Sequence, residues 1–170
     1  MTELSTELLQ MIANDPREFL RRNYRVEQRI KIKQERLAHI WQVGIAVTQT
    51  AKPAAAYTGP GDKTGSCAVE LVALQTEIED SLAELVLIQQ ETAFAIQHLV
   101  HDTTLRMILE AYYLSGMRWE EIACTMHYAY RWVQRLHRKG LNAMRIAAQS
   151  LCDVREEVEQ QEQRNEQRNF

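Results

Sequence analysis

Proline and glycine are scarce in this sequence, which holds three Pro and six Gly among 170 residues. Most of them fall in one segment, so tight turns should be rare elsewhere. The long remaining runs are rich in Glu, Gln, Leu, Arg and Ala, which have high helix propensity. We therefore predict an all-α fold in which strands are scarce.

Cysteines and long apolar runs are also few. Cys67, Cys124 and Cys152 lie far apart and form no C-x-x-C pair, and bridging two of them would leave one over. No stretch reaches the roughly 18 uncharged apolar residues of a membrane span, and the N-terminus lacks the cationic start and apolar core of a signal peptide. We expect a soluble, cytoplasmic protein with reduced thiols and no membrane contact.

Groups that would support catalysis are missing as well. Glu120 and Glu121 are neighbours, which point about 100° apart in a helix, and no nucleophile or glycine-rich phosphate loop accompanies them. His98 and His101 could share a helical face, but a metal needs more ligands than these two. The sequence predicts neither an enzyme nor a metal or cofactor site.

Charge is segregated along the chain, although the net charge is only −3. Residues 17–33 hold seven Lys/Arg against two Glu, and residues 70–91 hold six acids and no base. Residues 129–145 hold five bases and no acid, and the tail after Cys152 holds six acids and three Arg. Pairing the first basic run with the acidic run would favour an antiparallel helical hairpin, within the chain or between two subunits.

The first strong helix signal is Asp15-Pro16-Arg17-Glu18, which places an N-cap acceptor before Pro at the first helical position. A helix should begin there and continue along an imperfect 3-4 seam. The seam comprises Asn23, Val26, Ile30, Lys33, Leu37, Ile40, Gly44 and Val47. From about 48 to 67, Pro and Gly interrupt the pattern, which predicts a flexible connector.

A second 3-4 seam follows the connector and completes a hairpin or coiled coil within residues 1–101, which we expect to oligomerise. The seam comprises Leu71, Leu74, Ile78, Ser81, Leu85, Ile88, Thr92, Ala95 and Leu99. Leu82, Val86, Ala93, Ile96 and Val100 broaden it enough to meet more than one partner helix. The homo-oligomer is therefore part of the prediction.

Residues 102–150 have the pattern of a helix-turn-helix domain. A helix should start at the N-cap Asp102 and end at Gly116, a residue suited to the left-handed C-cap. Trp119, Ile122 and Ala123 then mark one face of a short helix, and a break over 127–129 follows. The next helix should bury Val133, Leu136, Gly140, Leu141 and Met144.

The opposite face of that last helix carries side chains suited to DNA. Arg131, Gln134, Arg135 and Arg138 should project outward. Arg can pair bidentately with guanine and Gln with adenine, and both can bind phosphate. A solvated helix face is the plainer alternative for this charge, and we assign Trp132 mainly to the core or to a partner surface.

The run Gly116-x-x-Trp119-Glu120-Glu121-Ile122-Ala123, with Val133-Gln134-Arg135-Leu136 and Leu141 after the turn, resembles region four of bacterial sigma factors. The whole layout is similar to phage and prophage regulators of the ArpU and RinA type, which control late genes. This resemblance implies base contacts by Tyr130, Arg131, Gln134 and Arg135, and a phosphate contact by Lys139. No sigma region two is evident, so promoter melting is not expected.

Three residues depart from that pattern. Arg118 replaces the usual Ser or Thr cap of the first motif helix, His127 replaces the turn glycine, and Gly140 replaces the usual Ala of the recognition helix. His tolerates positive φ better than most residues, and an interior Gly costs about 1 kcal/mol. The departures therefore affect the turn geometry more than the fold.

The predicted function is sequence-specific binding of double-stranded DNA, with activation of phage late genes in the bacterial host cytoplasm. One alternative is a DNA-packaging recognition subunit resembling a small terminase. Another is a protein-interaction adaptor that docks on host RNA polymerase. Residues 151–170 form an acidic, Gln-rich tail that we expect to be frayed.

Overall fold

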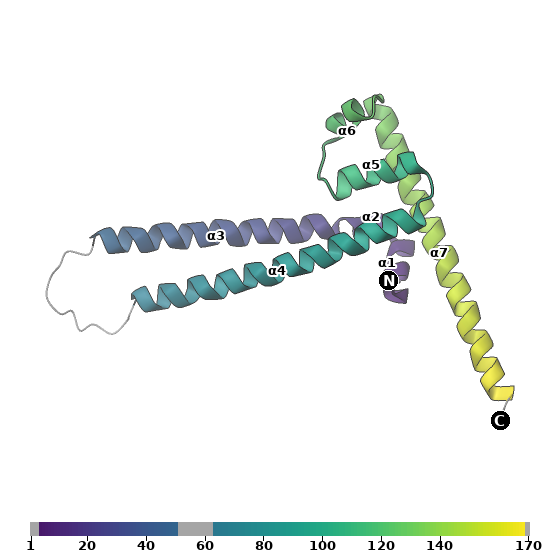
Figure 1. Ribbon diagram of the computed structural model, residues 1–170, viewed down its shortest axis with the longest axis horizontal. Helices are drawn as coiled ribbons and strands as arrows, with labels where there is room; N and C mark the ends of the chain where they lie inside the picture. The colour runs from purple at the N-terminus through teal and green to yellow at the C-terminus, as the bar shows by residue number, and fades with distance from the viewer. Residues whose placement is uncertain (1–3, 51–62, 169–170) are drawn as a thin grey trace. The chain divides into compact units, whose positions relative to one another are not determined.

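The structure, a computed structural model, describes the backbone of residues 4–50 and 63–168 and the side chains of residues 4–43 and 68–165. Every regular element in these ranges is an α-helix, which confirms the predicted fold class. The helices are α1 (Thr6–Asn14), α2 (Pro16–Leu20), α3 (Arg22–Thr50), α4 (Lys63–Leu99), α5 (Thr103–Tyr113), α6 (Trp119–Thr125) and α7 (Tyr130–Arg168) (Figure 1). No helix in the described ranges combines the length and hydropathy that crossing a membrane requires.

The chain forms two compact units, one of residues 24–87 and the other of residues 1–23 together with 88–170. This division differs from the predicted boundary between residues 101 and 102. The difference arises because α1 and α2, at the start of the chain, pack against α7 near its end. The N-terminal segment therefore belongs with the predicted DNA-binding residues and not with the hairpin.

The smaller unit is an antiparallel pairing of α3 with α4 (Figure 1). Three ion pairs fix the direction, and their positions run in opposite senses along the two helices. They are Arg29–Glu84 at 2.8 Å, Lys33–Glu77 at 3.4 Å and Arg36–Glu70 at 2.6 Å. The predicted pairing of basic with acidic runs therefore occurs, and it occurs within one chain. Because most of these side chains are well exposed, the pairs set orientation more than stability.

Two of the polar interruptions of the seams have a structural reason. Lys33 and Ser81 occupy seam positions, and Lys33 Nζ donates a hydrogen bond to Ser81 Oγ at 3.0 Å. Ser81 Oγ in turn donates to the carbonyl of Glu77 at 2.7 Å. Around them Ile30, Leu74 and Ile78 are buried. Lys33 and Ser81 thus satisfy one another, whereas Asn23 and Thr92, two further polar seam residues, are buried without a side-chain hydrogen-bond partner among the described residues.

The predicted connector over 48–67 was too long at both ends. The backbone remains helical through Thr50 and is helical again from Lys63. The remaining part, residues 51–62, lies outside the described residues. The first helix continues past the seam residue Val47, and the second begins before the seam residue Leu71, because Thr, Gln and Lys do not by themselves end a helix.

Helix starts follow local capping chemistry. Asp15 Oδ1 accepts hydrogen bonds from the backbone N–H of Arg17 at 2.9 Å and of Glu18 at 3.2 Å, as predicted. The helix that starts there is short, however: α2 ends at Leu20 and α3 begins at Arg22. Helix α1, capped by Ser5, was not among the predicted helices.

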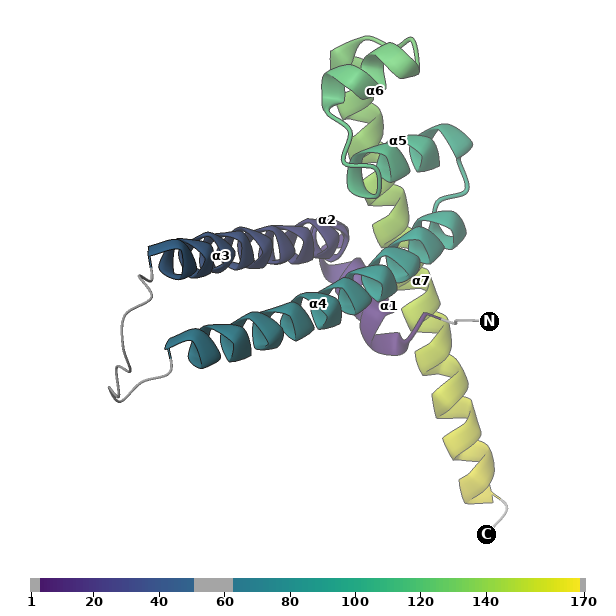
Figure 2. The ribbon, with the colours of Figure 1, turned by 60° about the vertical axis from the view of Figure 1, so that its left-hand side comes forward.

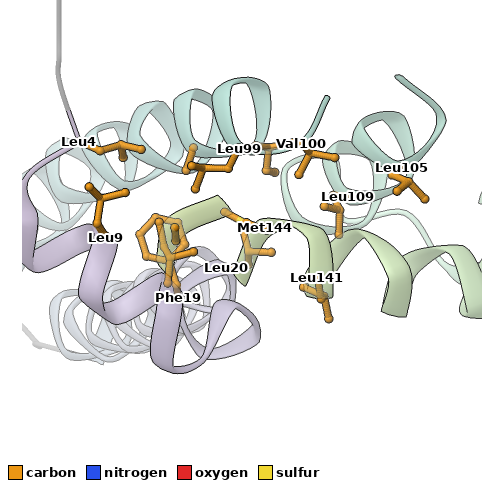
Figure 3. Packing of buried hydrophobic residues seen from close by; sticks show 14 of the residues in the cluster. Leu4, Leu9, Phe19, Leu20, Leu99, Val100, Leu105, Leu109, Leu141 and Met144 are labelled. Atoms are coloured by element: carbon orange, nitrogen blue, oxygen red, sulfur yellow. The ribbon is translucent and has the colours of Figure 1, made fainter. Parts of the chain in front are cut away.

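The core of the larger unit collects apolar side chains from the N-terminal segment, from the end of α4 with α5, and from α7 (Figure 3). Residues less than 2% exposed include Leu9, Ile12, Phe19, Leu20, Ile96, Leu109 and Met144. They come from α1, α2, α4, α5 and α7. Burial of this amount of apolar surface is the main stabilising contribution to the unit.

Over residues 151–168 the tail that was predicted to be frayed is instead the continuation of α7, and residues 169–170 lie outside the described residues. Cys152 is buried, and the Arg155 guanidinium donates from Nη1 to the carbonyl of Leu4 at 2.9 Å and to Thr6 Oγ1 at 3.3 Å. Composition alone did not show that α1 packs against α7 around Cys152 and Arg155.

Gly140 marks the close approach of α7 to α5. A Cβ placed on Gly140 would lie 3.2 Å from Leu109 Cδ1 and 3.6 Å from Leu105 Cβ. Both leucines are buried. The glycine that departs from the sigma-like pattern is therefore the residue that lets the two helices meet here.

We expect Gly140→Leu to lower the free energy of unfolding by about 1 to 3 kcal/mol, because the added side chain must displace Leu109 in a filled core. Gly140→Ala is the matched control. Its higher helix propensity, worth about 1 kcal/mol, should offset most of the tight contact. Chemical denaturation measures both variants, and a Leu variant as stable as the wild type would contradict the close approach.

Candidate nucleic-acid interface

Helix α6 begins without the usual Ser or Thr cap. Arg118 has no acceptor atom to offer the first amides, but its own backbone N–H donates to Glu121 Oε2 at 2.7 Å. Glu120 and Glu121 also place negative charge at the positive end of the helix. These acids therefore stabilise the start of the helix, which supplies a structural role for the adjacent Glu pair.

The turn after α6 is tight and contains a residue in the left-handed region. His127 has a φ of 55°, and the N–H of Tyr128 donates to the carbonyl of Ala123 at 3.0 Å. Helix α7 then begins at Tyr130. This confirms the predicted break over 127–129 and shows His127 in the conformation that the expected glycine would take.

Helices α5 and α6 lie beside the start of α7 (Figure 2), and a small apolar cluster holds the three together. Ile108, Ile122 and Val133 are at most 1% exposed, and Ala123 is buried beside them. Ile108 comes from α5, Ile122 and Ala123 come from α6, and Val133 comes from α7. The cluster fixes which face of α7 is inward and therefore which side chains are left for a partner.

His137 is the residue that sequence reasoning missed. It lies on α7 between predicted outward positions, yet it is only 6% exposed. Its Nε2 is 3.1 Å from the Tyr113 hydroxyl, and its ring meets the rings of Tyr112 and Trp119 at centroid distances of 5.5 and 4.8 Å. Tyr112 and Trp119 themselves stack at 4.0 Å. The helical spacing 133-137-141 is the signal that could have placed it on the inner face.

The surroundings of His137 and Tyr113 keep both side chains neutral near pH 7. Burial lowers the pKa of His137 to about 4, and the nearby positive charges of Arg17, Arg138 and Arg21 act in the same direction. Burial likewise raises the pKa of Tyr113 to about 12. The histidine and the tyrosine therefore form a neutral hydrogen bond between α7 and α5.

We expect this histidine to make the unit less stable in mild acid. Its folded pKa lies below the ordinary value of 6.5, so the unfolded state binds more protons, and its stabilising contribution is present above pH 6.5 and lost as the pH falls toward 4. Between pH 7 and pH 5 the loss should be about 2 kcal/mol. Denaturation at both pH values measures this loss, and His137→Gln should remove most of it. An equal loss in that variant would contradict the assignment.

The predicted DNA-contacting residues lie on the outer side of α7. Tyr130 is 41% exposed, Gln134 is half-buried, and Arg131, Arg135, Arg138 and Lys139 are exposed. Gln134 Nε2 donates to the Tyr130 hydroxyl at 3.0 Å, so these two residues form a pair. Arg138 and Lys139 lie one to two turns further along the helix than that pair.

Trp132 does not belong to the core, contrary to the first of the two roles expected for it. It is 44% exposed, and the Arg135 guanidinium carbon lies 5.4 Å from the centroid of its ring. Cation–π contact of this kind restrains an arginine that would otherwise move freely. The outer face therefore offers an aromatic platform next to Arg135.

Among the side chains that the structure describes, no group of His, Cys, Asp and Glu could hold a metal ion. His98 Nδ1 lies 2.8 Å from the carbonyl oxygen of Phe94, one turn earlier in the same helix. Comparison with family models, curated proteins and solved structures finds no match to this chain. Any functional inference therefore rests on the chemistry of α6 and α7.

Proposed function

We propose that this chain is a sequence-specific double-stranded DNA-binding regulator of transcription, and not an enzyme. The observation that carries the proposal is the outer face of α7, where Arg131 and Arg135 are exposed and Gln134 is half-buried, directly after a tight turn. The face is basic, and residues 129–145 contain no acid. Such a helix fits the major groove, with base edges as partners of its first turns.

The apolar cluster beneath this face supports the same function. Reading bases requires side chains whose backbone is held in place, and Ile122 and Val133 provide this by burying α6 against α7. Exposed arginines on a frayed helix would attract DNA without fixing which base pairs they contact. A helix fixed on two others can favour one sequence over another.

The more specific form of the proposal is a helix-turn-helix like region four of sigma factors, used to activate late genes of a phage. The short helix α6, the turn through His127 and the outward Arg/Gln set on α7 support it. Under this proposal host RNA polymerase is a further partner, and the protein acts as a homo-oligomer in the bacterial cytoplasm.

Titration of the protein against fluorescent duplex fragments from its own genomic neighbourhood tests the proposal. We expect tight binding to one fragment and an affinity that falls steeply between roughly 50 and 200 mM salt. Weak binding of equal strength to every fragment would overturn the sequence-specific function. Binding to RNA polymerase without DNA would then favour an adaptor.

A further inference from the structure

A groove of about 370 Å³ lies where the junction of α1 and α2 meets α7, within the larger unit. Its polar lining comes from two distant parts of the chain. Arg17, Asp15 and Asn14 lie on one side, and Arg138, Asn142 and Arg145 lie on the other. Neither segment alone would form the groove.

The groove carries an excess of positive charge. Three arginines line it against one acid, Asp15. One oxygen of that carboxylate already accepts hydrogen bonds from the backbone N–H of Arg17 and Glu18, so it is partly used in capping α2.

The arginines have donors left for a ligand. Arg145 Nη2 donates to Asn142 Oδ1 at 3.0 Å, which orients the guanidinium and leaves its other N–H groups available. Arg17 and Arg138 are exposed at the groove. Guanidinium groups bind phosphate oxygens through paired N–H donors, so the chemistry of the site suits a phosphate.

The groove also lies at a suitable distance from the proposed base-reading residues. Positions 131, 135, 138, 142 and 145 follow a 4-3-4-3 spacing and therefore share one face of α7. With a rise of about 1.5 Å per residue, Arg138 lies about 10 Å from Arg131 along the axis and Arg145 about 21 Å. The major groove is only about 8.5 Å deep. When the first turns of α7 touch bases, Arg138 is at the level of the sugar-phosphate backbone, and Arg145 lies about 10 Å further along the helix axis.

We propose that the groove formed by Arg17, Arg138 and Arg145 binds a backbone phosphate of the DNA that α7 reads. The inference rests on the proposed function and extends it, because it gives the N-terminal segment a direct part in DNA binding. Arg17 contributes affinity without sequence preference, whereas the first turns of α7 contribute the preference.

The test compares Arg17→Ala and Arg145→Ala with the wild type on the preferred duplex and on an unrelated duplex. Arg17→Ala keeps the backbone N–H that Asp15 caps, so α2 should stay folded. Arg21→Ala is the matched control, since Arg21 is exposed just after α2 and does not line the groove. Circular dichroism and thermal melting confirm that each variant is folded.

We expect Arg17→Ala and Arg145→Ala each to weaken binding to both duplexes by about tenfold and to reduce the salt slope by about one. Arg21→Ala should change the affinity by less than about twofold. Suppose the wild type prefers one duplex, and Arg17→Ala binds it as tightly as the wild type or as Arg21→Ala does. The groove inference is then overturned while the proposed function stands.

Failure of the wild type to bind any duplex would overturn both proposals. A titration with inorganic phosphate would then show whether the groove binds free phosphate. In this titration the arginine Nε–H signals are followed by nuclear magnetic resonance as phosphate is added. Saturation by phosphate in the wild type but not in Arg17→Ala, without duplex binding, would assign the groove to a free phosphate and would reject the DNA backbone.

Discussion

Replacing both Arg131 and Arg135 with alanine should weaken binding to the preferred duplex by about a thousandfold, or about 4 kcal/mol. Each guanidinium can donate two hydrogen bonds to one guanine, and each such pair contributes about 1 to 3 kcal/mol of discrimination. Arg135 is also restrained by the Trp132 ring, so it loses less freedom on binding. Titration of the preferred and an unrelated duplex at one fixed salt concentration measures the effect.

The loss should be larger on the preferred duplex than on the unrelated one, because base contacts exist only on the former. A control that removes the same amount of charge is Lys31→Ala with Arg164→Ala, both exposed and far along the sequence from the turn before α7. The control should weaken the two duplexes by a similar and smaller factor. Equal losses in the two double variants would show that total charge, and not this face of α7, determines binding.

Phe19→Ala should lower the free energy of unfolding of the larger unit by about 3 to 5 kcal/mol. The Phe19 side chain is fully buried in the cluster that joins α1 and α2 to α7, and the Arg22 guanidinium lies 4.2 Å above its ring. Truncation removes the apolar contacts and leaves a cavity that neighbouring side chains can fill only in part. Denaturation monitored by circular dichroism measures the change.

Two further variants separate packing from a general effect of substitution. Phe19→Leu keeps the site apolar and should cost less than half as much as Phe19→Ala. Met11→Ala, at a position that is 41% exposed on α1, should change stability by less than about 1 kcal/mol. If Phe19→Ala were as mild as Met11→Ala, the packing of α2 in this core would be contradicted.

Local chemistry explains the features that could be predicted. Asp102 caps α5 through its own carboxylate, Gly116 takes a φ of 63°, and both follow from residues within four positions. The same holds for the break after α6. The outward face of α7 was predictable because the buried positions Val133 and Met144 repeat at helical spacing.

The features of the candidate site that the sequence did not predict depend on contacts between residues far apart in the chain. His137, which sequence reasoning did not place, is buried, and Trp132, expected mainly in the core or at a partner surface, is 44% exposed. Burial of each depends on which neighbouring helix covers each side of α7. Periodicity gives the apolar stripe of a helix but not the width of the partner that covers it. Tyr112 and Trp119 extend that cover far enough to enclose an imidazole.

The sequence by itself determined the helical fold class, the capped helix ends and the opposite charges that orient α3 against α4, because each depends on propensity or on neighbours along one helix. Only the tertiary structure decided that α1 and α2 join α7. Arg155 meets the carbonyl of Leu4 across 151 positions, and Arg17 shares a groove with Arg138. Contacts at that separation depend on how apolar faces from distant segments fit together, and many pairings of such faces satisfy the same sequence pattern.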